Sequence, residues 1–166
     1  LPRCVLCGHS PPVLRINMSN IDQAVDCFGQ GFACSQAILA TYGEPLGLPR
    51  EQALKLAEGF AGGMAGLGET CGAVTGALLV LGLKHGRTQP DDLKAKMATN
   101  RLVREFMRQF EARRGSVKCR DLLGCAIDTP EKLLAARDRK LFTTVCPGFV
   151  RDAAEILEAL LAGGSR

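Results

Sequence analysis

Aromatic residues are scarce in this chain of 166 residues, which has no tryptophan, one tyrosine and seven phenylalanines. Basic residues exceed acidic ones by 21 − 17 = 4, and they never form a block longer than a pair. Proteins that bind nucleic acid usually cluster basic residues on one face and add aromatic side chains for stacking. The composition therefore argues against a nucleic-acid partner.

Long apolar segments are also missing. The charge-free run from Thr70 to Leu83 is shorter than the about 20 apolar residues that a bilayer-spanning helix needs. Residues 1–17 lack the apolar core of a secretory signal. We therefore expect a protein that does not span a membrane and that resides in the reducing cytoplasm.

No segment shows the alternation of apolar and polar residues, with hairpin turns, that predicts a β-sheet. The 46% hydrophobic and 23% charged residues are typical of a globular protein, and 166 residues fit one domain. We predict an all-α, single-domain bundle of six to eight helices around a central buried helix. Residues 18–166 would form this domain, and residues 1–17, which have two adjacent prolines and no helical period, would be an extension outside its core.

Caps and glycines set the expected helix boundaries. The sequence Gln89-Pro-Asp-Asp92 opens the longest helix, which stops at Gly115, and Thr129 opens a helix that ends near Val145. The inward face of the longest helix is predicted to carry Leu93, Met97, Val103, Phe106 and Phe110. The predicted helices cover residues 21–28, 33–42, 49–61, 71–83, 89–114, 119–124, 129–145 and 146–162.

Glycine is concentrated in one stretch, because nine of the 19 glycines lie between Gly59 and Gly86. Residues 62–68 are too rich in glycine for a stable helix interior, so we expect a loop there. The uncharged segment that follows, residues 71–83, is the predicted central buried helix. Gly72 and Gly76 share one face of it and permit a close helix approach, within the chain or across a homodimer contact.

Eight cysteines are more than packing requires, and in a reducing compartment they indicate metal binding or redox chemistry. Four of them stand at predicted helix starts: Cys34, Cys71, Cys119 and Cys146. Free backbone N–H groups at such places favour the thiolate, which attacks disulfides and binds metals. We therefore expect these thiols, Cys71 above all, to ionise more easily than a free thiol. The alternative is that the four cysteines are simply packed in the core.

The other cysteines give weaker signals. Cys4 and Cys7 form one CxxC, which is half of a zinc site without its second half. Cys27 and Cys125 are interpreted as packed or exposed bystanders.

Only one histidine, His85, lies outside the predicted extension. It is at the far end of the central helix from Cys71, about 21 Å away at 1.5 Å per residue, so the two cannot form a catalytic pair. We expect His85 to stabilise the helix C-terminus as a cation. Glu69, two residues before Cys71, would cap the helix or move a proton, and capping is favoured.

The order of residues resembles the bacterial C-GCAxxG-C-C family of redox-active proteins. The resemblance rests on Gly31-Phe-Ala-Cys34, on Cys71-Gly-Ala-Val-Thr-Gly76 after a glycine loop, and on Cys119 and Cys146 before a last helix. It spans about residues 20–161 and implies that Cys34, Cys71, Cys119 and Cys146 are the four family cysteines. It leaves the other four cysteines outside the pattern. Ala33 departs from the polar cap expected before the first cysteine.

Three functions are compatible with these residues. The first is a cysteine redox protein, a thiol–disulfide oxidoreductase or electron carrier that needs no cofactor and serves a partner protein or a small thiol. Cys71 would be its principal thiolate, resolved by Cys34, Cys119 or Cys146. The second is a module whose four thiolates hold zinc or an iron–sulfur cluster. The third is a helical scaffold with inert cysteines. No CxxC joins any two of the four, so their pairing stays open.

Overall fold

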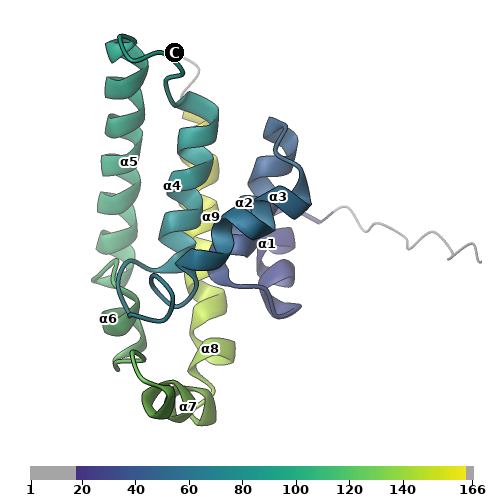
Figure 1. Ribbon diagram of the computed structural model, residues 1–166, viewed down its shortest axis with the longest axis vertical. Coiled ribbons are helices and arrows are strands. Elements are labelled where there is room, and N and C mark those ends of the chain that lie inside the picture. Colours follow the sequence, from purple (N-terminus) through teal and green to yellow (C-terminus); the bar gives the residue numbers. More distant parts are fainter. Residues whose placement is uncertain (1–17, 164–166) are drawn as a thin grey trace, which may run out of the picture.

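The chain is all-α in the computed structural model, which describes residues 18–163 (Figure 1). The predicted extension over residues 1–17, with its CxxC, lies outside the described residues. Within residues 18–163 there is no β-strand, only an isolated bridge between Thr70 and Lys118. Eight helices have five residues or more, and α8 is a single turn, so the predicted all-α bundle is confirmed. The elements are α1 (Asn20–Gly29), α2 (Cys34–Gly43), η1 (Glu44–Leu46), α3 (Arg50–Ala57), η2 (Glu58–Phe60), α4 (Gly72–His85), α5 (Leu93–Arg114), α6 (Cys119–Leu123), α7 (Pro130–Asp138), α8 (Leu141–Thr144) and α9 (Cys146–Gly163).

Helix α4 is the central element, as predicted. It packs against α2, α5 and α9, while α2 packs in addition against α1, α3 and α9 (Figure 1). Figure 1 shows α4, α5 and α9 running lengthwise, with α1, α2 and α3 to one side and α6, α7 and α8 at the lower end. The glycine loop, defined here as residues 62–68, lies at the lower end of α4. None of the helices in the described part is long and apolar enough to cross a membrane.

Several helix boundaries follow from local capping. The Ser19 hydroxyl accepts a hydrogen bond from the Asp22 N–H (3.2 Å), and Asp92 Oδ1 accepts one from the Ala95 N–H (2.9 Å). Gly115 ends α5 in the left-handed conformation (φ 80°), as predicted.

The predicted helix over residues 129–145 is wrong in its second half. The helix is interrupted after α7, where Lys140 adopts φ 56°, and α8 follows as a separate turn. A lysine in the left-handed region costs backbone energy, and no glycine or proline marks the break in the sequence.

Helix α2 is buried on almost every side. The Ser35 hydroxyl donates to the Ala57 carbonyl (2.8 Å), which satisfies the polar group inside the core. Ala33 provides no side-chain cap, but its N–H donates to Gln36 Oε1 (2.9 Å). This bond is the glutamine half of a capping box, so the start of α2 is held without the expected polar residue.

Two glycines allow α2 and α4 to approach closely. A Cβ built on Gly76 would lie 2.8 Å from the Ser35 carbonyl oxygen and 3.0 Å from Ile38 Cβ. One built on Gly72 would lie 3.1 Å from the Ser35 nitrogen. The small-residue face proposed for a dimer contact is therefore occupied by α2 of the same chain.

The upper ends of α4 and α5 are less buried than the sequence predicts. Leu83 of α4 is 43% exposed, and Leu93 and Met97 of α5 are 60% and 71% exposed. The core face of α5 begins later, at Leu102. The residues of α5 that are fully inside are Leu102, Phe106 and Phe110.

Substituting Gly76→Ala should lower the free energy of unfolding by about 1–3 kcal/mol, because the added methyl group overpacks the contact with α2. The matched control is Gly82→Ala in the same helix, where an added Cβ meets no atom within 4 Å. That change should stabilise by about 0.4–1 kcal/mol through the unfolded state. Urea unfolding followed by circular dichroism measures both. Equal stability of the two variants would contradict the close contact.

Candidate functional site

The four cysteines at helix starts converge. Cys34 and Cys146 are the first residues of α2 and α9, Cys119 is the first of α6, and Cys71 is the N-cap of α4. The charges of Cys71, Cys119 and Cys146 all raise the pKa of the Cys34 thiol, so the four sulfurs are electrostatic neighbours. All four belong to the same hydrophobic core or pack against it. We call them the four-thiol cluster.

Backbone pairing holds the second and third cysteines side by side. The Cys71 N–H donates to the Val117 carbonyl (2.8 Å), and the Cys119 N–H donates to the Glu69 carbonyl (2.7 Å). These bonds join the end of the glycine loop to the chain that enters α6. Two cysteines 48 positions apart in sequence are thus placed by main-chain hydrogen bonds, which do not depend on side-chain identity.

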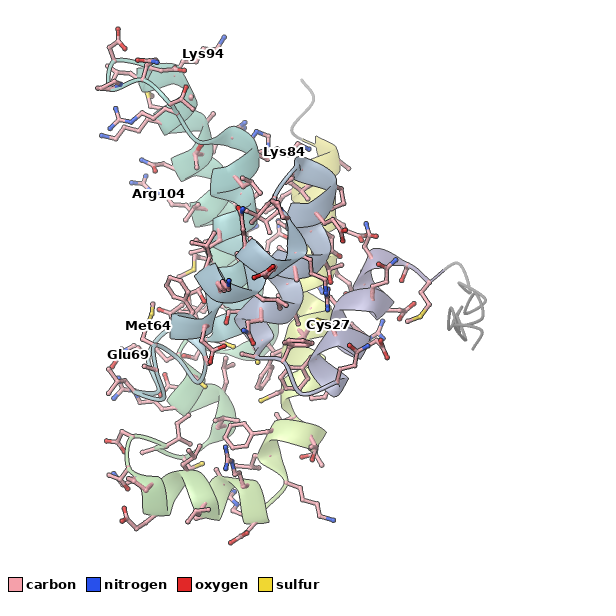
Figure 2. All side chains as sticks on the ribbon, turned by 45° about the vertical axis from the view of Figure 1, so that its right-hand side comes forward. Cys27, Met64, Glu69, Lys84, Lys94 and Arg104 are labelled. Atoms are coloured by element: carbon pink, nitrogen blue, oxygen red, sulfur yellow. The ribbon has the colours of Figure 1, made fainter. Side chains whose placement is uncertain are left out.

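The glycine loop lies directly on Cys119. A Cβ on Gly63 would be 2.8 Å from Cys119 Cβ and 2.6 Å from the Glu69 carbonyl oxygen, and Gly63 adopts φ 70°. Only glycine fits there without a shift of backbone. Figure 2 shows Met64 and Glu69 together on this loop, beside the start of α6. The loop is therefore a close-packed cover over one side of the cluster.

The close contact between α2 and α4 places the first cysteine. A Cβ on Gly72 would be 3.4 Å from Cys34 Cβ, so the residue after Cys71 touches Cys34. A steric constraint thus explains why the Cys-Gly-Ala sequence has a glycine at this position. It lets the first turn of α2 reach the N-cap of α4.

Burial reverses the expected ionisation of Cys71. The N–H groups of Ala73 and Val74 lower its pKa, but loss of solvent raises it more, to about 11. Burial likewise raises the pKa of Cys119 to about 12, and the charges of nearby thiols add to this. The sequence-based expectation of an easily ionised Cys71 is therefore wrong, because a sulfur with 2% of its residue exposed cannot keep its hydration.

Cys146 is the thiol of the cluster that ionises most easily. A hydrogen bond from the Cys34 thiol lowers the pKa of Cys146 despite burial, and the same bond is the main cause that raises the pKa of Cys34. The two sulfurs therefore share one proton, which lies on Cys34 and favours the thiolate form of Cys146. This pair is separated by 112 positions in the sequence, which offers no sign of it.

Glu69 does not cap α4. Its carboxylate forms an ion pair with Arg120, which ties the glycine loop to α6, and both side chains are partly exposed.

His85 also differs from expectation. Burial and the neighbouring Lys84 lower its pKa, so the neutral imidazole is favoured at the end of α4.

The two remaining described cysteines differ from each other. Cys27 lies on α1, and Arg50 Nη2 donates to its sulfur (3.5 Å). Figure 2 shows Cys27 well away from Met64 and Glu69. Cys125 is half-buried, and its charge raises the pKa of Cys119, so it borders the cluster. Sequence reasoning grouped Cys125 with the bystanders because it follows the helix stop at Gly124.

All six cysteines in residues 18–163 are free thiols. Within the same residues, no group of three or more His, Cys, Asp or Glu side chains is arranged as a metal-ligand set. The four-thiol cluster is thus convergent but does not have the geometry of a zinc or iron–sulfur site. We derive no chemical step through a metal.

Comparison with known families gives one match. The model of the family described as "Putative redox-active protein (C_GCAxxG_C_C)" matches residues 32–160. The four cysteines of the cluster all lie within the matched residues, and the resemblance inferred from the sequence is confirmed. Comparisons with curated proteins and with solved structures give no match.

Replacing Cys34 by alanine should raise the pKa of Cys146, because the hydrogen bond that stabilises its thiolate is lost and only burial remains. Thiolate absorbance at 240 nm measures this. The step that belongs to Cys146 is isolated by subtracting the titration of the same protein with Cys146→Ala. Cys27→Ala is the control and should leave the step in place. An unchanged step in Cys34→Ala would refute the shared proton.

Proposed function

Because the chain belongs to the C_GCAxxG_C_C family, we propose that it is a thiol–disulfide redox protein in which Cys34 and Cys146 carry one pair of electrons. The observation that supports this most is their shared proton. A thiolate beside a protonated partner thiol is the arrangement that attacks a disulfide and then resolves the product.

The reaction has two steps. The Cys146 thiolate attacks one sulfur of a disulfide that is presented to it inside the cluster, forms a new S–S bond and expels the first thiolate. The Cys34 thiol then gives its proton to that thiolate and attacks Cys146 Sγ, which expels the second thiolate. The disulfide is reduced by two electrons, and the Cys34–Cys146 dithiol becomes a disulfide. No cofactor is needed, and Cys71 remains a thiol throughout.

The raised pKa values of Cys71 and Cys119 agree with a reaction in which Cys146 is the attacking thiolate. Both stay uncharged at neutral pH, so the negative charge of the cluster is favoured on Cys146, whose pKa is lowered, instead of being spread over several thiols. Repulsion among buried thiolates would be costly. The proposed setting is a reducing compartment such as the cytoplasm, where a dithiol is maintained, and the proposed partner is a disulfide-bearing protein or a small disulfide.

A redox titration tests the proposal. Protein purified without oxygen is equilibrated with glutathione buffers of graded potential, the remaining thiols are alkylated, and the labels are counted by mass spectrometry. We expect a two-electron couple that removes two labels at once, with a tenfold change in the equilibrium constant per about 30 mV. Cys34→Ala and Cys146→Ala should each abolish this couple, and Cys27→Ala should leave it intact.

Two results would contradict the proposal. One is a couple that survives in Cys34→Ala and Cys146→Ala proteins shown by circular dichroism to be folded. The other is stoichiometric zinc or iron in the anaerobic preparation, which elemental analysis and visible absorption detect and which would favour the metal-binding alternative.

A further inference from the structure

The four-thiol cluster has little direct access to solvent. Cys71, Cys119 and Cys146 are only 2%, 7% and 4% exposed, and the glycine loop covers Cys119. Cys34 is half-buried, but its thiol holds the proton shared with Cys146 and its pKa is raised well above the usual value. A thiol that stays protonated is a poor nucleophile. A disulfide in solution therefore needs another point of reaction.

Cys125 is such a point, because the turn at the C-terminus of α6 determines where it lies. The Cys125 N–H donates to the Arg120 carbonyl and the Gly124 N–H to the Asp121 carbonyl, each at 3.1 Å, and Gly124 has φ 65°. This pair of bonds, six-to-one and five-to-two, defines a Schellman motif. In many such motifs the residue after the glycine packs on the third or fourth residue before the helix end. Because α6 is only five residues long, the fourth such residue is Cys119.

Two further features agree with this placement. The charge of Cys125 raises the pKa of Cys119, which agrees with a short distance between the two sulfurs. Cys125 is also only half-buried, and it packs against the core that contains the cluster.

On the premise of the proposed function, we infer that Cys125 is the exchange thiol, the residue at which an external disulfide first reacts before its oxidising equivalents pass through Cys119 to the Cys34–Cys146 pair. Cys125 lies outside the four-cysteine pattern of the family.

The transfer balances at every step. The Cys125 thiolate attacks the external disulfide, forms a mixed disulfide and expels one thiolate. Cys119 passes its proton to that thiolate and attacks Cys125 Sγ, which expels the second thiolate and gives a Cys119–Cys125 disulfide. The Cys146 thiolate attacks Cys119 Sγ and frees Cys125 as a thiolate. Cys34 then attacks Cys146 Sγ, and its proton goes to the departing Cys119. The external disulfide gains two electrons, and the Cys34–Cys146 pair loses them.

The test measures rate and end point separately, with oxidised glutathione as the probe and full-length protein. Cys125→Ala should lower the second-order rate constant for oxidation of the cluster by about tenfold or more, because only slow opening of the core remains as a route. Its equilibrium redox couple should match that of the unsubstituted chain. Cys27→Ala, the matched control, should change neither quantity. In Cys119→Ala, the glutathione adduct should accumulate on Cys125, as identified by peptide mass spectrometry.

The inference is overturned if Cys125→Ala is oxidised at the rate of the unsubstituted chain, or if the adduct in Cys119→Ala forms on Cys34 instead. These outcomes differ from failure of the proposed function, in which the unsubstituted chain itself shows no two-electron couple. The rate measured for Cys125→Ala does not require the Cys119→Ala protein to fold. Cys125→Ala itself should fold, because Cys125 is only half-buried and the substitution removes one heavy atom.

Discussion

The close approach of α2 to α4 is the contact on which the site depends. Gly72 and Gly76 leave room for the backbone of Ser35, and this brings Cys34 to the N-cap of α4. Backbone bonds then add Cys119, and the start of α9 adds Cys146. Four cysteines on four helices meet because helix starts, where side chains can point along the axis toward a common centre, are gathered at one level of the bundle.

Burial governs the chemistry of this cluster more than the helix dipole does. Raising the pKa of Cys71 from 9.0 to about 11 means that its surroundings favour the neutral thiol by about 3 kcal/mol. A helix N-terminus contributes about 0.3–1 kcal/mol in the opposite direction at an exposed site. Cys146 is the exception within the cluster, because the hydrogen bond that it accepts from Cys34 lowers its pKa despite burial. Local hydrogen bonding thus favours the thiolate at one of the four cysteines, and under the proposed function this selects which cysteine attacks.

Sequence reasoning reached the helical fold, most helix starts and the four cysteines, because caps, glycines and the Cys-Gly-Ala motif are local signals. It missed what depends on packing. The left-handed Lys140 leaves no trace in composition, and the exposure of Met97 depends on which helices pack beside that end of α5. It favoured Cys71 as thiolate because desolvation cannot be read from one residue. It grouped Cys125 with the bystander cysteines, although Gly124 already indicated the turn in which the Cys125 N–H donates back to α6.

Direct identification of the linked cysteines tests the central claim, that Cys34 and Cys146 form the electron-carrying pair. Reduced protein is oxidised with one equivalent of oxidised glutathione, left to reach equilibrium, alkylated at low pH and digested without reductant. Mass spectrometry of the crosslinked peptides should show Cys34 joined to Cys146, with Cys71 and Cys119 alkylated. A Cys71–Cys119 crosslink with Cys34 and Cys146 alkylated would contradict the account.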